Sequence, residues 1–171
     1  MQGLVQVYTG DGKGKTTAAL GLALRAAGAG LRVYIGQLIK NAAYSELTAL
    51  QRLADHITIA QFGRGCCLLT EPGQADIDAA RQGLERIGQV LASGRFAVVI
   101  ADEANVAVAL GLISEDDLLA LIARKPPQVE LVLTGRGAPP AVMDRADLVT
   151  EMRSIKHYYD QGILARKGIE S

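Results

Sequence analysis

Short apolar runs rich in valine and isoleucine alternate along the chain with stretches whose apolar residues recur at helical spacing. The runs of strand length cover residues 4–8, 32–38, 57–62, 96–101, 129–134 and 148–151. Strands that alternate with helices favour a parallel sheet covered by helices. The pattern therefore predicts the α/β class, with a mostly parallel central sheet and helices on both of its faces.

The clearest helix lies between the third and fourth apolar runs. Charged and amide side chains fill one face of this stretch, and apolar side chains recur on the other. The apolar positions are Ile77, Ala80, Leu84, Ile87 and Leu91. This spacing predicts one amphipathic helix lying on the sheet.

A further helix is marked by its ends. Ser114, followed three residues later by Asp117, resembles a capping box at a helix start. Pro126 and Pro127 stop the helix that follows. Residues 41–55 and the tail after Arg153 carry no comparable pattern.

Composition narrows the class of protein. Of the 171 residues 49% are apolar, and 18 basic side chains balance 18 acidic ones. A chain of this length forms the core of one domain, which we assign to residues 1–171. No block of one charge and no apolar run near the roughly 18 residues of a membrane span is present. We therefore expect a soluble, cytoplasmic protein that acts on small molecules, with neither nucleic acid nor a membrane as partner.

The two cysteines, Cys66 and Cys67, are neighbours in the sequence. Adjacent cysteines form a disulfide only across a strained peptide unit. His56 and His157 are the only histidines, so the paired ligand spacing of a tetrahedral zinc site is missing. We interpret the cysteines as small, partly buried free thiols.

A glycine-rich loop follows the first apolar run and precedes a helical stretch that opens at Ala18. Its residues are Gly10, Asp11, Gly12, Lys13, Gly14, Lys15, Thr16 and Thr17. The glycines let successive backbone N–H groups face one anion, and the helix start and Lys15 add positive charge. The Thr16 hydroxyl is placed to bind Mg²⁺. Strand, loop and helix in this order predict a P-loop triphosphate site, although Thr9 stands where the usual pattern has glycine.

Two carboxylates, Asp102 and Glu103, end the fourth apolar run. The carboxyl ends of parallel strands converge on the ligand crevice, so these acids should lie near the glycine-rich loop. Either one can hold Mg²⁺ directly or through water while the other orients it. The alternative is a structural one, in which the acids cap the next helix.

Four segments carry a more specific signal. They are the glycine-rich loop with Arg25, the pair at 102–103, residues 134–137, and residues 151–157 with Gly162 and residues 167–169. Together they resemble the P-loop ATP:cob(I)alamin (corrinoid) adenosyltransferases. The resemblance implies a protein with a RecA-like fold that is usually a homodimer. Such a protein transfers the 5′-adenosyl group of ATP to Co(I) of a reduced corrinoid. The corrinoid implied is cob(I)alamin or cob(I)yrinic acid a,c-diamide, and triphosphate is the leaving group. The resemblance also implies an electron-donating reductase as partner.

The resemblance also assigns roles to single residues. Residues 10–17 match the triphosphate contacts, and Arg25 matches a residue that contacts the nucleoside end of ATP. Glu103 matches the acid associated with Mg²⁺, which favours it over its neighbour as the metal ligand. Arg136 follows the fifth strand and is near enough by topology to reach a phosphate. Lys15, Glu103 and Arg136 are therefore the predicted catalytic residues.

Several alternatives stay open at this point. Arg25 and Arg136 are otherwise ordinary exposed arginines. The tail around His157 either lines the corrinoid entrance or packs on a neighbouring subunit. Familiar family members carry aromatic residues after the third strand, whereas residues 63–69 here contain none and Phe62 is the sole aromatic nearby.

Two other functions fit a P-loop. An ATP hydrolase or kinase would use Glu103 as a base and release ADP. A nucleotide-gated binding module would bind ATP without turning it over. The products formed from ATP distinguish these possibilities.

Overall fold

A six-stranded parallel sheet forms the centre of the computed structural model, which describes residues 2–64 and 71–170. The strands are β1 (Val5–Thr9), β2 (Val33–Gln37), β3 (Ile57–Gln61), β4 (Val98–Asp102), β5 (Glu130–Thr134) and β6 (Leu148–Glu151). Their order across the sheet is β3-β2-β4-β5-β1-β6, and every neighbouring pair is parallel. All six predicted strands are confirmed, with small shifts at their ends.

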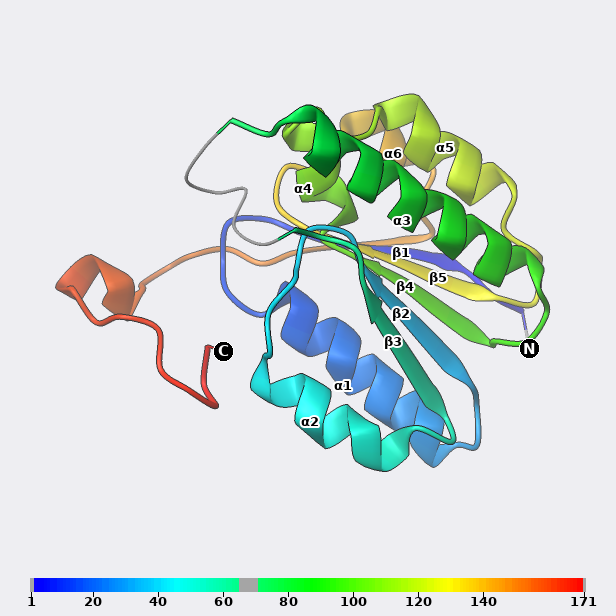
Figure 1. Cartoon of the computed structure of the whole chain (residues 1–171), viewed down its shortest axis with the longest axis horizontal. Helices are drawn as coiled ribbons and strands as arrows, with labels where there is room; N and C mark the ends of the chain where they lie inside the picture. The colour runs from blue at the N-terminus through cyan, green and yellow to red at the C-terminus, as the bar shows by residue number, and fades with distance from the viewer. Residues whose placement is uncertain (1, 65–70, 171) are drawn as a thin grey trace.

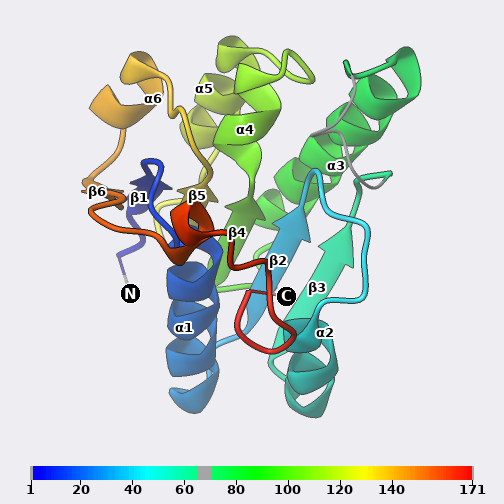
Figure 2. The same ribbon diagram turned by 90° about the vertical axis from the view of Figure 1, so that its left-hand side faces the viewer.

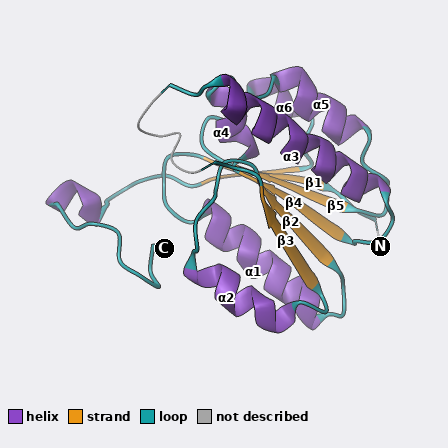
Figure 3. Cartoon of the chain, in the orientation of Figure 1, coloured by secondary structure: helices purple, strands orange, loops and turns teal. Residues whose placement is uncertain are grey.

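Helices cover both faces of this sheet (Figures 1 and 3). One face carries α1 (Lys15–Gly28) and α2 (Ser45–Leu50). The other carries α3 (Gln74–Ala92), α4 (Ala104–Ala109), α5 (Glu115–Ala123) and α6 (Pro140–Asp144). Short 3-10 turns occupy Gln51–Leu53 and Tyr158–Gln161. The predicted fold class is therefore confirmed, and the sheet is parallel throughout its described strands.

Each central strand is buried on both sides. In β4, Val98 and Ile100 pack in the cluster that contains α1, whereas Val99 and Ala101 pack in the cluster that contains α3. Full burial of a valine or isoleucine side chain stabilises a fold by about 1.5–3 kcal/mol. Burial on both faces is why the strands read as apolar runs, and it fixes where their carboxyl ends lie.

Helix boundaries follow local chemistry. The capping box of α5 is confirmed, because Ser114 Oγ accepts a hydrogen bond from Asp117 N (3.1 Å) and Ser114 N donates one to Asp117 Oδ2 (2.8 Å). This helix ends at Ala123, before the two prolines. Helix α1 begins at Lys15 rather than at Ala18, because Gly14 at φ 121° ends the loop and places the next residue in the first turn.

The carboxyl ends of the strands face one side of the molecule, and Figure 2 looks onto that side. The glycine-rich loop follows β1, which lies between β5 and β6. The chain beyond β6 extends from the sheet on the same side (Figures 1 and 2). No helix in residues 2–64 or 71–170 combines the length and apolarity needed to cross a bilayer. Cys66 and Cys67 lie outside these described residues.

Candidate nucleotide site

The glycine-rich loop folds around the Lys15 side chain. Lys15 Nζ donates hydrogen bonds to the carbonyl oxygens of Gly10 (2.6 Å) and Gly12 (2.7 Å), and the residue is 9% exposed. Burial lowers the pKa of Lys15, as does the nearby positive charge of Arg136, whereas Glu103 and Asp11 oppose that shift. The loop thus holds a partly desolvated ammonium at the start of α1, as a phosphate site requires.

The segment after β6 lies directly on this loop. Met152 O accepts a hydrogen bond from Gly12 N (2.6 Å), and Met152 N donates one to Thr9 O (2.8 Å). A Cβ atom on Gly12 would stand 2.7 Å from Met152 O, so this close approach requires glycine. Sequence reasoning missed this contact between segments far apart in the chain.

Thr9, the departure from the usual loop pattern, has a structural use. It is the last residue of β1 and is 7% exposed. Its Oγ1 accepts a hydrogen bond from Ala138 N (3.2 Å), which ties the loop after β5 to β1. The threonine therefore joins two of the segments that border the site.

Asp102 is the most heavily bonded side chain at the site and is 1% exposed. Its Oδ1 accepts from the hydroxyls of Thr16 (2.9 Å) and Thr134 (2.7 Å). Its Oδ2 accepts from Gln37 Nε2 and Lys40 Nζ, both at 2.9 Å. The carboxylate links α1 to the ends of β2, β4 and β5. This arrangement fits the orienting role that the sequence left open for one of the two acids.

Glu103 is held by its backbone. It has φ 62° and ψ 20°, and among the described residues it alone combines a side chain with a positive φ. Such a conformation costs on the order of 1–3 kcal/mol and occurs most often at functional sites. Glu103 N donates a hydrogen bond to Thr134 Oγ1 (2.9 Å). The Glu103 side chain forms no capping hydrogen bond to α4, so the structure does not show the capping role that the sequence left open.

Positive charges converge on the Glu103 carboxylate. Burial raises its pKa, and the negative charge of Asp102 raises it further. Lys40, Lys15 and Arg136 all act to lower it. An acid in this position is suited to attract a cation that would relieve its repulsion with Asp102.

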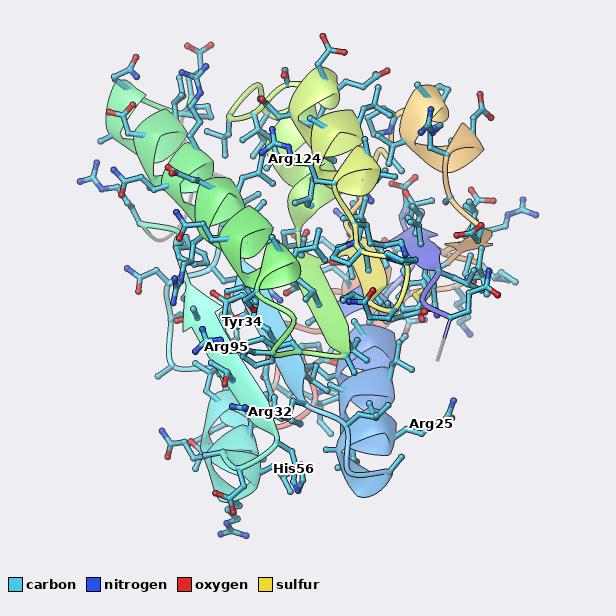
Figure 4. All side chains as sticks on the ribbon, turned by 90° about the vertical axis from the view of Figure 1, so that its right-hand side faces the viewer. Arg25, Arg32, Tyr34, His56, Arg95 and Arg124 are labelled. Atoms are coloured by element: carbon cyan, nitrogen blue, oxygen red, sulfur yellow. The ribbon has the colours of Figure 1, made fainter. Side chains whose placement is uncertain are left out.

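The two predicted arginines lie in different places. Arg136 Nη2 donates to Asp11 O (3.3 Å), so the structure brings this arginine to the loop. Arg25 is in the last turn of α1, roughly 15 Å along the helix from Lys15 at 1.5 Å per residue. Figure 4 shows its side chain pointing away from the ribbon. Its contact with the nucleoside end of ATP stays a prediction.

The remaining loop residues differ in exposure. Asp11, Lys13 and Thr17 are exposed, whereas Gly10, Gly14 and Thr16 are of intermediate exposure and Gly12 is buried. Exposed polar groups at the mouth of the loop are open to an entering ligand. The structure thus brings residues 10–17 together with Asp102, Glu103 and Arg136.

Oxygen donors at the site suit a hard divalent cation such as Mg²⁺. No group of three or more histidine, cysteine, aspartate or glutamate residues is gathered for a metal within the described part of the chain. Mg²⁺ commonly uses one or two carboxylates, water and substrate phosphates, and so does not need such a group. The Thr16 hydroxyl and the Glu103 carboxylate are hard oxygen ligands of that kind.

Three polar side chains at the site were missed by sequence reasoning as site residues. Gln37, Lys40 and Thr134 lie at or just after the ends of β2 and β5, and all three bond within the Asp102 group. The signal that drew attention to Asp102, a polar residue at the carboxyl end of an apolar run, applied to them as well. Burial lowers the pKa of Lys40, but the charge and hydrogen bond of Asp102, together with the charges of Glu103 and Glu46, outweigh burial, so that pKa is raised.

The tail folds on itself near its end. Tyr158 hydrogen bonds to Glu170, and Arg166 lies over the Tyr158 ring at 4.8 Å from its centroid. His157 is 4.6 Å from the same ring. Apolar side chains of the tail remain exposed, including Ile155 (95%) and Leu164 (73%).

A glycine-rich loop between strand and helix, beside a strand ending in two acids, defines a P-loop nucleotide-binding protein. Residues 1–171 match the family described as ATP:corrinoid adenosyltransferase BtuR/CobO/CobP. The chain therefore belongs to this family of enzymes, whose general function is the ATP-dependent adenosylation of corrinoids.

Relatives of similar length support this membership. The chain is 37% identical to a corrinoid adenosyltransferase of Pseudomonas aeruginosa, in a match covering 99% of this chain and 84% of the relative. It is 32% identical to the corrinoid adenosyltransferase of Escherichia coli K12, covering 99% and 86%. Corrinoid adenosyltransferase CobA of Salmonella typhimurium is also 32% identical over the same shares.

Proposed function

We propose that this protein transfers the 5′-adenosyl group of ATP to Co(I) of a reduced corrinoid and releases inorganic triphosphate. The observation that carries the proposal is the meeting of the Lys15 loop with Asp102 and Glu103 in a member of this family. Residues 1–171 act in it as one domain in the cytoplasm. An electron-donating reductase supplies the corrinoid in its Co(I) form.

The proposed reaction does not depend on general acid or base catalysis by the protein. Co(I) is itself a strong nucleophile, and it attacks the ribose 5′-carbon while the bond to the α-phosphate oxygen breaks. Negative charge grows on the departing triphosphate. Lys15, Arg136 and the loop N–H groups stabilise that charge more in the transition state than in the ground state. No proton has to be abstracted, so no general base is required.

Mg²⁺ is the metal that the donor set supports. Thr16 and Glu103 would hold it, while Asp102 orients the Thr16 hydroxyl through their hydrogen bond. When bound, the ion would supply further positive charge at the triphosphate. The Glu103 carboxylate is surrounded by the charges of Lys40, Lys15 and Arg136, and it remains available because it caps no helix.

The deciding experiment identifies the products. The protein, MgATP and a chemically reduced corrinoid should yield an adenosylated corrinoid and inorganic triphosphate in equal amounts, and neither without the corrinoid. ADP formed without corrinoid would instead establish a hydrolase or kinase, which breaks a bond at the γ-phosphorus. ATP binding without any product, while a family member of known activity works in the same buffer, would establish a binding module.

A further inference from the structure

Lys40 lies in the middle of the proposed metal site. It follows β2, and its Nζ is 2.9 Å from Asp102 Oδ2 and 3.1 Å from Thr16 Oγ1. The ring of Tyr44 faces the ammonium, with its centroid 5.5 Å away. The side chain is only 16% exposed. The protein therefore encloses a positive charge between Thr16, a proposed Mg²⁺ ligand, and Asp102, the carboxylate that orients it.

Asp102 has no free acceptor position in this arrangement. An ionised carboxylate offers about four lone-pair sites. Thr16 and Thr134 use Oδ1, and Gln37 and Lys40 use Oδ2. A cation that approached this carboxylate would have to displace one of these four donors.

The Thr16 hydroxyl is similarly engaged. A hydroxyl has one hydrogen to donate and two lone pairs to accept with. Thr16 donates to Asp102, and Lys40, which can only donate, occupies one of its lone pairs. Lys40 thus uses an electron pair through which Thr16 would bind a metal.

Lys40 is also the donor easiest to displace. Gln37 and Thr134 belong to strands and are fully buried, and Thr16 is fixed in the first turn of α1. Lys40 comes from the chain after β2, and its flexible stem of four carbons carries a compact charge. An arriving cation would compensate Asp102 when the ammonium leaves.

We propose that Lys40 is the resident cation of the nucleotide-free site and that a divalent cation displaces it. This inference rests on the proposed metal site. Lys40 keeps the buried Asp102 neutralised in the free protein and weakens the capture of free metal ions. Mg²⁺ then enters chiefly together with ATP, whose phosphates complete its ligand set.

The first test measures Mn²⁺ binding by electron paramagnetic resonance, without nucleotide or corrinoid. Lys40→Met should bind Mn²⁺ roughly tenfold more tightly than the wild type, because the metal no longer competes with charged hydrogen bonds. Lys40→Arg, which keeps a cation, should stay near the wild-type affinity. Lys167→Met is the matched control, since it removes one exposed lysine charge and should change nothing. Equal or weaker binding by Lys40→Met would overturn the proposal.

The second test uses the wild-type protein, so it holds even where a Lys40 variant does not fold. A brief pulse of an amine-acylating reagent is followed by mass spectrometry, with and without saturating Mn²⁺. Displacement should raise the labelling of Lys40 several-fold relative to Lys167 in the same sample. Unchanged or reduced labelling would show that the ammonium stays on Asp102 and would refute displacement. Neither test uses the adenosylation reaction, so failure here leaves the products of catalysis as a separate measurement.

Discussion

The two adjacent acids at the end of β4 are held in different ways. Asp102 is buried and accepts four hydrogen bonds, while Glu103 is held by its backbone and meets surrounding charges. Replacing Asp102 by asparagine turns one acceptor into a donor that faces other donors. Replacing Glu103 by glutamine breaks no such network. Substitutions of these two neighbours should therefore have different effects: at Asp102 mainly on stability, and at Glu103 mainly on metal binding.

Asp102→Asn should lower the free energy of unfolding by about 3 kcal/mol, because it breaks a buried ion pair from one side. Glu103→Gln should leave that free energy unchanged or higher, yet raise the Mg²⁺ concentration needed for half-maximal activity. Urea unfolding of the nucleotide-free proteins and a Mg²⁺ titration of the rate measure the two effects. Similar unfolding midpoints for both variants would contradict the structural role of Asp102.

A substitution at Lys15 tests whether the glycine-rich loop binds the phosphates of ATP. Lys15→Ala should reduce ATP affinity by roughly ten- to a hundredfold, the loss expected for a hydrogen bond to a charged group. Calorimetric titration measures the affinity, and Lys13→Ala, at an exposed position of the same loop, should lose less. Unchanged binding by Lys15→Ala would remove the basis for a P-loop site.

At the level of elements, α5 depends on a charge at its start. Ser114 N and Oγ both donate to Asp117 Oδ2, at 2.8 Å each, and these bonds lower the pKa of Asp117. A lowered pKa means that the folded protein favours the ionised acid. Its stabilising effect is fully present above the ordinary aspartate pKa, about 3.9, and is lost as pH falls through the lower folded value.

Ser114→Ala should therefore destabilise the protein by about 1 kcal/mol at neutral pH, as loss of an N-cap does. Asp117→Asn should also destabilise it at neutral pH, but the difference from the wild type should vanish at a pH below the folded pKa of Asp117. Unfolding midpoints in urea across this pH range give both values. A difference for Asp117→Asn that persists at the acid end would exclude the ionised cap as its cause.

The glycines of the loop and of α1 respond in opposite directions to the same substitution. Gly21 is exposed in α1, with no atom within 4 Å of an added Cβ, so Gly21→Ala should stabilise by about 0.5–1 kcal/mol. Gly12→Ala should weaken both stability and ATP binding, because its Cβ would collide with Met152 O. Thermal unfolding and calorimetry test the pair. An ATP affinity unchanged by Gly12→Ala would show that the loop moves freely away from Met152.

The central strands were predictable because burial on both faces makes each of them an apolar run, as in β4 with Val98 to Ala101. The loop and the acids were predictable because each lies next to such a run. The contacts of Lys40 with Asp102 and of Met152 with Gly12 could not be predicted from the sequence. Each contact joins segments that only the order of strands in the sheet brings together. The start of α1 was predicted at Ala18 instead of Lys15, because the positive φ of Gly14 that ends the loop leaves no periodic signal in the sequence.

For the molecule as a whole, we expect a symmetric homodimer, the commonest closed assembly. Exposed apolar side chains on β6 and the tail, such as Leu148 (43%) and Leu164 (73%), fit a surface that a second copy covers. Light scattering at micromolar concentration should give twice the mass of the chain. A tail variant such as Leu164→Ser should shift the equilibrium toward monomer, and a wild-type protein that is already monomeric would reject this expectation.

The position of β1 between β5 and β6 has a consequence for biosynthesis. A growing chain that has been translated through β4 already contains the whole glycine-rich loop and both acids. It lacks both neighbours of β1, and it lacks the Met152 carbonyl that contacts Gly12. Pairings between distant segments form late, because the intervening chain must first be closed into a loop. We therefore expect the ATP site to be complete only in chains synthesised beyond residue 152, in which β6 has paired with β1.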